Sequence, residues 1–121
     1  MVTVAIVDDD DGLRRALCAL LETSGRAVKH FASGKDFLDS ASGNGIDVAV
    51  LDLRMPGMSG LQVLRDLLPL KFPVIMMSAD GDVRSAVEAI KLGATDFIEK
   101  PFTPDELETL IDKALTPAPF T

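Results

Sequence analysis

The chain has 121 residues, of which 47% are hydrophobic and 26% charged, a composition that is typical of one globular domain and excludes a disordered chain. Its formal net charge of −7 argues against a nucleic-acid-binding surface, because no stripe of lysine or arginine offsets the repulsion from phosphates. The single cysteine, Cys18, excludes an intramolecular disulfide, and with no apparent signal peptide or membrane span we expect a soluble cytoplasmic protein.

The first part of the chain alternates between predicted strands and helices. Residues 2–7 are apolar and rich in β-branched side chains, which predicts a buried strand that a run of aspartates ends. Apolar residues at helical spacing then predict a helix up to Gly25, a residue type common just after a helix C-terminus. Residues 27–31 predict a second strand, and Ser33 with Asp36 resembles the capping box that opens a helix.

The middle of the chain predicts the central strand of a sheet. Residues 46–51 form an apolar run, preceded by a loop at residues 42–45, that suits a strand buried on both faces. Asp52 ends this strand, and Met55-Pro56-Gly57 turns the backbone away directly afterwards. A carboxylate in this place lies where open α/β sheets carry their chemistry, although a lone aspartate can also simply close a strand.

Five more elements follow. Residues 61–68 predict a third helix, residues 73–78 a buried strand and residues 96–98 a short last strand. Between these two strands we expect a helix whose apolar face consists of Val83, Ala86, Val87 and Ile90. Thr103, Pro104 and Glu106 have the capping-box pattern that begins a final helix. The expected buried stripe of that helix consists of Leu107, Leu110, Ile111, Ala114 and Leu115.

Strands that alternate with helices predict an α/β fold with a single doubly wound five-stranded parallel sheet covered on both faces. We expect this one domain at residues 1–115, and a linker or C-terminal tail from residue 116 to 121. Polar residues follow four strands, and in such a sheet all of them lie at the same edge. They are Asp8 and Asp9, Asp52, Ser78, and Lys100.

These strand-end residues together predict a phosphoryl-transfer site. Clustered carboxylates repel each other and favour a bound cation, and Mg²⁺ is the hard cytosolic ion that oxygen ligands suit. Lys100 provides a positive charge for a phosphate oxygen, Ser78 a hydroxyl donor and Asp52 a nucleophile. Taken singly, each has a plainer interpretation: a helix N-terminal aspartate, a strand-end hydroxyl or a surface lysine.

Three segments, residues 6–10, 51–60 and 96–102, resemble the receiver domain of two-component response regulators. The resemblance covers essentially the whole chain and implies a flavodoxin-like fold with strand order 2-1-3-4-5. It is strongest to the FixJ type, whose members usually carry a C-terminal DNA-binding helix-turn-helix domain. It implies a phosphoacceptor switch and not an enzyme, with at most self-catalysed phosphorylation and slow autodephosphorylation.

The resemblance also implies roles for individual residues. Asp52 is the phosphoacceptor, Asp9 a direct metal ligand, and Asp8 a ligand that acts through water or an orienting contact. The backbone carbonyl of Arg54 completes the ligands of Mg²⁺.

On the phosphate side of the site, the resemblance implies that Lys100, before a cis bond to Pro101, binds phosphate and assists catalysis. Ser78 is the switch hydroxyl, where threonine is commoner in the family. Phe97 is the switch aromatic and lacks the hydroxyl of a tyrosine. Asp80 adds a negative charge to a nearby loop where the family often has a small residue or histidine.

Two kinds of partner are expected: a kinase, which the resemblance implies, and a second copy of the chain, which opposite charges on one surface patch predict. A sensor histidine kinase would donate the phosphoryl group, and phosphorylation would turn a monomer into a homodimer through the fourth helix and fifth strand. The expected dimer face consists of Arg84, Glu88, Lys91, Asp96 and Glu99. Lys91 of one copy would pair with Asp96 of the other, although solvated surface charges are a plainer interpretation. We expect no nucleic acid or membrane to bind this domain itself.

Other functions remain open at this stage. Asp8 and Asp10 have the D-x-D spacing of a haloacid-dehalogenase-type phosphatase with Asp8 as nucleophile, but Gly12 stands where that family has threonine or valine. A flavodoxin that binds FMN would need a phosphate loop after the first strand, where aspartates would repel the phosphate. His30, the single histidine, is expected to be a structural or surface residue.

Overall fold

The computed structural model describes residues 1–40, 45–79 and 81–116, in which strands and helices alternate along the chain. The strands are β1 (Thr3–Val7), β2 (Ala27–Phe31), β3 (Val48–Asp52), β4 (Val74–Ser78) and β5 (Asp96–Glu99). The helices are α1 (Asp11–Thr23), α2 (Gly34–Ser40), α3 (Gly60–Leu67), α4 (Val83–Leu92) and α5 (Pro104–Leu115). These bounds agree with the predicted elements to within a few residues.

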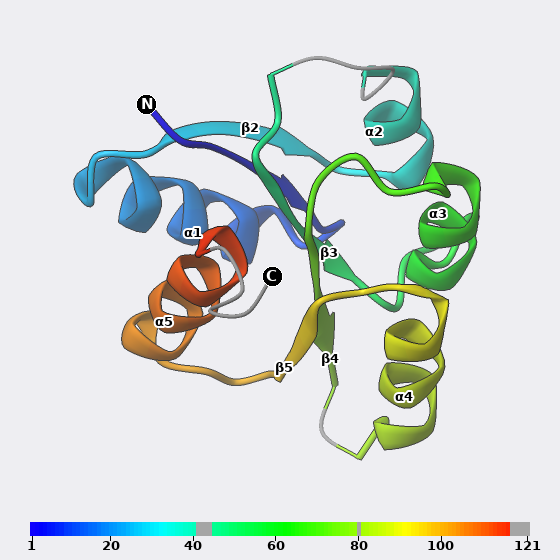
Figure 1. Ribbon diagram of the computed structural model, residues 1–121. Coiled ribbons are helices and arrows are strands. Elements are labelled where there is room, and N and C mark those ends of the chain that lie inside the picture. The colour runs from blue at the N-terminus through cyan, green and yellow to red at the C-terminus, as the bar shows by residue number, and fades with distance from the viewer. Residues whose placement is uncertain (41–44, 80, 117–121) are drawn as a thin grey trace.

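The strands form one parallel sheet with the order β2-β1-β3-β4-β5. Helices α1 and α5 cover one face of the sheet, and α2, α3 and α4 cover the other (Figure 1). The predicted α/β class is confirmed, and so is the strand order that the resemblance implied. Since all strands run in the same direction, their carboxyl ends lie at one edge of the sheet.

Side chains of the central strands alternate between two apolar cores. In β1, Ala5 and Val7 pack towards α2, α3 and α4, whereas Val4 and Ile6 pack towards α1 and α5. Every residue of β3 and of β4 is buried, as expected for apolar strands that helices cover on both faces. Burial on both faces holds the ends of these strands firmly in place.

Local capping signals in the sequence correspond to bonds in the structure. Thr103 Oγ1 accepts from the backbone N–H of Glu106 at 3.2 Å, and Glu106 Oε1 accepts from the backbone N–H of Thr103 at 3.3 Å. Ser33 Oγ accepts from the backbone N–H of Asp36 at 3.1 Å. Gly25 follows α1 with φ +89°, a conformation that favours glycine.

Helix α4 differs from the prediction in the face that it turns towards the sheet. Of the four residues predicted to form its apolar face, only Ala86 is buried, and it is joined by Ala89. Val83, Val87 and Ile90 are 52%, 42% and 40% exposed. The helix has apolar residues over a wide arc, so periodicity alone does not decide which half packs on the sheet. The small alanines allow α4 to approach the sheet closely and leave the larger side chains outside.

In the described ranges, none of the helices combines the length and the apolar character that a membrane crossing requires. Three predictions concern residues outside these ranges: most of the loop at residues 42–45, Asp80, and the tail after residue 116. The proposed boundary between the domain and a tail therefore stays a prediction.

Candidate functional site

The carboxyl edge of the sheet brings together residues that lie far apart in the sequence. Asp8 and Asp9 follow β1, Asp52 is the last residue of β3, and Lys100 follows β5. Strands β1 and β3 are neighbours in register, with Val7 opposite Leu51, so that the chain segments following both strands begin side by side. The predicted convergence of these residues is confirmed.

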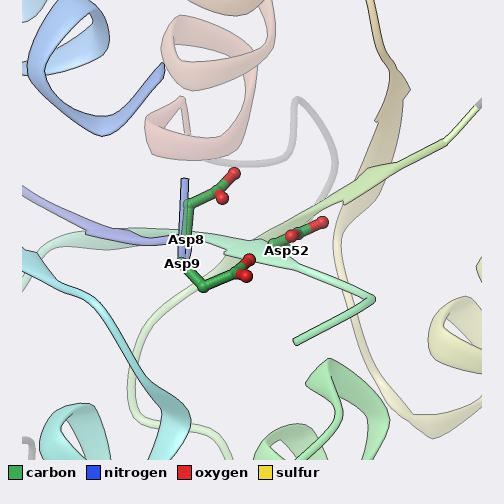
Figure 2. A group of neighbouring side chains, drawn as sticks. All are labelled: Asp8, Asp9 and Asp52. Carbon is green, nitrogen blue, oxygen red and sulfur yellow. The ribbon is translucent and has the colours of Figure 1, made fainter. Parts of the chain in front are cut away.

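Three carboxylates form the centre of this edge. One oxygen from each of Asp8, Asp9 and Asp52 lies within 4.8 Å of the other two, and Figure 2 shows the three side chains as neighbours that extend in a similar direction. Asp8 is fully buried and Asp52 is 5% exposed, whereas Asp9 is exposed to solvent. The cluster therefore has two carboxylates within the protein and one at its surface.

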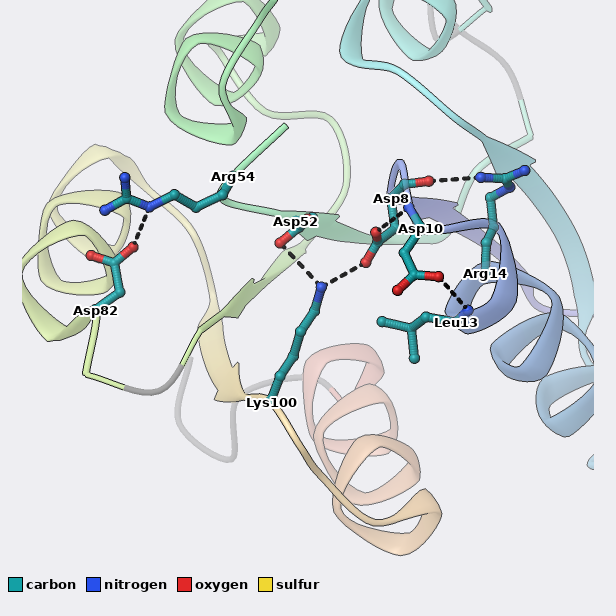
Figure 3. Close-up of polar contacts among 8 residues, drawn as sticks. All are labelled: Asp8, Asp10, Leu13, Arg14, Asp52, Arg54, Asp82 and Lys100. Atoms are coloured by element: carbon teal, nitrogen blue, oxygen red, sulfur yellow. Dashed lines mark hydrogen bonds and ion pairs between the residues drawn. The ribbon is translucent and has the colours of Figure 1, made fainter. Parts of the chain in front are cut away.

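Lys100 partly offsets this negative charge. Its Nζ lies 2.8 Å from Asp8 Oδ2 and 3.4 Å from Asp52 Oδ1 (Figure 3). Asp8 Oδ1 accepts a further hydrogen bond of 2.9 Å from the backbone N–H of Asp10. The Lys100–Pro101 peptide bond is cis, as the resemblance implied.

Burial and charge shift the proton affinities at this edge. Burial, and then the negative charge of Asp8, raise the pKa of Asp52 to about 6, while Lys100 and the backbone N–H of Arg54 oppose the rise. Burial acts to lower the pKa of Lys100, but the hydrogen bond to Asp8 and the charges of Asp52 and Asp8 outweigh it and raise that pKa. At neutral pH, Asp52 is thus largely ionised and Lys100 is charged.

The donor set fits a hard divalent cation. It consists of carboxylate oxygens within reach of a single ion, which is the ligand type that Mg²⁺ prefers. One ammonium group faces three carboxylates here, so a cation would relieve the repulsion that remains. The residues Asp8, Asp9 and Asp52 together are able to hold such an ion.

Other predicted site residues surround this cluster at different distances. Ser78 is 1% exposed at the end of β4, and its neighbour Met77 is in register with Asp52. Phe97 of β5 is partly buried against the core under α2, α3 and α4. The side chain of Arg54 points away from the carboxylates, and its Nε donates to Asp82 Oδ2 at 2.9 Å (Figure 3).

The residues expected at a dimer face lie on α4 and β5, but two of them already have partners within the chain. Glu88 accepts a hydrogen bond of 2.7 Å from Arg65 of α3. Asp96 lies 4.0 Å from Nζ of Lys113 in α5. The other three residues are exposed: Arg84, Lys91 and Glu99.

Sequence reasoning missed Arg14, which is buried next to the acidic loop, the segment of Asp8, Asp9 and Asp10 between β1 and α1. Its Nη1 donates to the backbone carbonyl of Asp8 at 2.9 Å, and its Nε donates to Nδ1 of His30 at 3.2 Å. His30 therefore has a structural contact, in line with its predicted role. A signal was present in the sequence: an arginine in the first turns of a helix opposes the helix dipole and needs a special reason.

Comparison with known proteins places these features in one family. The chain matches the family model described as "Response regulator receiver domain" over residues 4–112. The transcriptional regulatory protein FixJ of Rhizobium meliloti (strain 1021) is 46% identical over 114 residues, which are 93% of this chain and 56% of that protein. FixJ of Bradyrhizobium diazoefficiens is 40% identical over 117 residues, or 95% of this chain and 57% of that protein. The chain thus spans about half the length of the curated relatives that it matches.

Solved structures agree with this match. The crystal structure of FixJ-N has a TM-score of 0.89 at 44% sequence identity, and the match covers 95% of this chain and 94% of that chain. Full-length FixJ from B. japonicum has a TM-score of 0.88 at 40% identity, covering 94% of this chain and 57% of that chain. The resemblance read from the sequence is confirmed for both the family and the FixJ type.

Proposed function

Because the chain belongs to the response regulator receiver family, a family of signalling switches, we propose that it accepts a phosphoryl group on Asp52 from a sensor histidine kinase. One observation carries the choice of residue. Asp52 is a nearly buried carboxylate beside two further carboxylates, and a lysine ammonium lies 3.4 Å from it. A carboxylate nucleophile next to a positively charged lysine suits phosphoryl transfer.

The proposed reaction forms one bond and breaks one. An oxygen of ionised Asp52 attacks the phosphorus of a phosphohistidine on the kinase, the phosphorus–nitrogen bond breaks, and the imidazole leaves with the electron pair. The product is an acyl phosphate on Asp52. Lys100 would donate to an oxygen of the transferred group, and Ser78 would offer its hydroxyl at the adjacent strand end.

The proposed cofactor is Mg²⁺, held by Asp8, Asp9, Asp52 and the backbone carbonyl of Arg54. When bound, it supplies positive charge that stabilises the charge developing on the transferred oxygens. The chain itself contributes the placement of the carboxylates at one sheet edge. Lys100, which bonds to Asp8 at 2.8 Å, would be free to turn towards the phosphoryl group when a cation shares the charge of Asp8.

Phosphorylation with a small donor tests the proposal. The chain should incorporate phosphate from acetyl phosphate only when Mg²⁺ is present, and borohydride reduction followed by peptide mass spectrometry should identify residue 52 as the modified one. Asp52→Asn should not incorporate phosphate at this site. Asp66→Asn, the same change at an exposed position of α3, should behave as wild type.

The same experiment separates the receiver function from the phosphatase considered earlier. Label on Asp8, or equal incorporation by Asp52→Asn, would contradict the proposal. The family match supports the receiver, and both oxygens of Asp8 already accept hydrogen bonds, from Lys100 and from the backbone of Asp10. Asp8 is therefore poorly placed to act as the nucleophile.

We further propose that phosphorylation changes the surface of α4 and β5 and causes two copies to associate. Ser78 and Phe97 lie on the strands between Asp52 and this surface. A shift of Ser78 towards the phosphate would leave space into which the side chain of Phe97 could turn. The exposed stripe of Val83, Val87 and Ile90 on α4 supports an interface, because apolar side chains in contact with solvent gain from being covered.

For the whole protein we propose control of transcription in the cytoplasm. The FixJ relatives carry the name transcriptional regulatory protein, and this chain matches about half of their length. In this proposal residues 1–115 are the receiver, residues 116–121 begin a linker, and a C-terminal output domain binds DNA. The receiver itself would not bind DNA, since its net charge is −7.

A further inference from the structure

Arg14 lies next to the acidic loop that follows β1, and the protein encloses almost all of its charge. Its side chain is 11% exposed. Nη1 donates a hydrogen bond of 2.9 Å to the backbone carbonyl of Asp8, as Figure 3 shows. Nη2 donates to the carboxylate of Asp11, and Nε donates to Nδ1 of His30 at 3.2 Å. Three nitrogens of one guanidinium thus bond to three different residues.

Local preferences do not favour an arginine in this place. It is the fourth residue of α1, where a positive charge opposes the helix dipole. A guanidinium withdrawn from water also loses hydration, which its hydrogen bonds must offset. These bonds connect α1 to the acidic loop and to β2. A residue that breaks local preferences is often one that a functional site requires.

The contact from Arg14 fixes the backbone of a residue whose side chain belongs to the carboxylate cluster. Asp8 is held through its side chain by Lys100 at 2.8 Å, and through its carbonyl by Arg14 at 2.9 Å. Asp10, two residues later, accepts from the backbone N–H of Leu13 at 3.1 Å and so ties the far end of the loop to α1 (Figure 3). The backbone N–H of Asp8 donates to the carbonyl of Phe31 at 3.1 Å, so without Arg14 the loop would keep that bond and lose the one to the Asp8 carbonyl.

We propose that Arg14 is a positioning residue, which holds the loop so that the carboxylates of Asp8 and Asp9 face Asp52; this inference rests on the Mg²⁺ site of the proposed function. His30 supports Arg14, because the bond to Nδ1 fixes the plane of the guanidinium. Contacts that orient metal ligands without touching the metal typically change metal affinity by about 10- to 100-fold. Arg14 itself touches none of the reacting atoms.

Magnesium binding by the full chain tests this proposal. MgCl₂ would be titrated while NMR follows the backbone amides of residues 8–11 and 52. Arg14→Met should raise the dissociation constant for Mg²⁺ about tenfold. Arg14→Lys keeps the charge but not the planar fork, so it should raise the constant by an intermediate factor. Arg15→Met removes the same charge from the adjacent exposed position and should change the constant by less than about twofold.

A second series at His30 keeps the test decisive if Arg14→Met does not fold. His30→Phe removes the acceptor of the Arg14 Nε bond, and it should weaken Mg²⁺ binding in the same direction by a smaller factor. His30→Gln retains an acceptor oxygen and should restore binding towards the wild-type value. A role in packing alone would not distinguish phenylalanine from glutamine in this order.

Wild-type affinity in a folded Arg14→Met chain, or in His30→Phe when the former is unfolded, would overturn the proposal. Equal weakening by Arg14→Met and Arg15→Met, with full recovery in Arg14→Lys, would also overturn it, since charge alone would then explain the effect. A wild-type chain that binds no Mg²⁺ would instead overturn the metal site of the proposed function, and this inference with it.

Discussion

The surroundings of Asp52 disfavour the ionised form of its carboxyl group. Burial and the nearby carboxylate of Asp8 raise its pKa to about 6, from an ordinary value of 3.8. Between these two values the folded chain binds more protons at residue 52 than the unfolded chain does. The contribution of Asp52 to the free energy of unfolding therefore falls as the pH rises from about 4 to about 6, by on the order of 3 kcal/mol.

We expect Asp52→Asn to stabilise the metal-free protein at neutral pH. The amide carries no charge, so the gain over wild type should be largest above pH 7 and should shrink towards pH 4. Urea unfolding in EDTA at several pH values measures this difference. Asp66→Asn, at an exposed position, serves as the control and should show almost no gain. A gain for Asp52→Asn that does not depend on pH would contradict the assigned shift.

The sequence predicted that the strand-end residues lie close together. It did not predict the contacts of Arg14 and His30 that hold the loop after β1. Asp8, Asp52 and Lys100 converge because each ends a parallel strand, a property that is visible in the order of apolar runs. Arg14 and His30 are 16 residues apart and meet only because α1 packs beside β2. No local pattern encodes such a contact, so it emerges from the folded structure alone.

At the scale of elements, the start of α3 packs directly on the strand that ends in Asp52. A Cβ atom at Gly60 would lie 2.2 Å from the carbonyl oxygen of Asp52 and 2.8 Å from Cα of Leu53. Both are backbone atoms and cannot turn aside as a side chain would. Only glycine permits this close approach of helix and strand. The contact with α3 therefore fixes the position of the Asp52 backbone at the edge of the sheet.

We expect Gly60→Ala to destabilise the fold by about 2–3 kcal/mol, since the added methyl group forces the helix and strand apart. Displacement of the Asp52 backbone should also weaken Mg²⁺ binding. The matched control is Gly12→Ala in α1, where a Cβ would meet its nearest atom at 3.4 Å, an ordinary contact. That variant should be neutral or more stable by about 0.5–1 kcal/mol. Urea unfolding of both variants measures their free energies of unfolding. Equal values for Gly60→Ala and Gly12→Ala would contradict the packing argument.

In helix α4, the spacing of apolar residues did not identify the face that packs on the sheet. The sequence predicted one apolar face of Val83, Ala86, Val87 and Ile90, of which only Ala86 is buried. The sheet instead accepts Ala86 and Ala89, because small residues allow close packing. The exposed side chains of Val83, Val87 and Ile90 support the proposal that α4 belongs to an interface.

At the scale of the whole molecule, metal binding should increase stability. A ligand that binds only the folded chain adds RT ln(1 + [L]/Kd), or about 2.7 kcal/mol at one hundred times Kd. For a domain of 121 residues we expect Mg²⁺ at one hundred times Kd to raise the melting temperature by roughly 10 °C at pH 7.5. Calorimetry with and without MgCl₂ measures the change in melting temperature, and NaCl of equal ionic strength is the control. No rise beyond that of NaCl would contradict the metal site.

The proposed association of two copies also belongs to this scale. The beryllofluoride-loaded chain should form a dimer through α4 and β5, and light scattering should show its mass double. Lys91→Glu should prevent the dimer, and Asp96→Lys in the same chain should restore it if these two side chains pair across the interface.

Lys35→Glu reverses a charge on exposed α2 and provides the matched control. It should leave the dimer intact. A loaded chain that stays monomeric at high concentration, or a dimer that Lys91→Glu does not affect, would rule out this face. Substitution of Val87 by serine separately tests the apolar part of the interface.

Arg54 joins the edge of the sheet to α4 through one contact at the surface. Its backbone N–H acts to lower the pKa of Asp52, two residues earlier in the chain, and its side chain bonds to Asp82, the residue before α4 (Figure 3). The side chain of Arg54 is 71% exposed, but its Nε lies 2.9 Å from Asp82 Oδ2, well within the Debye length of about 10 Å at 0.1 M salt, so dissolved ions weaken their attraction only in part. NMR shifts of α4 amides on beryllofluoride loading, at low and high salt, would measure this effect, and Arg54→Met should remove the salt dependence. Under the proposed function we therefore expect a rise in cellular salt to weaken the contact between Arg54 and Asp82, and with it the response of α4 to a phosphoryl group on Asp52, while the signal from the kinase stays the same.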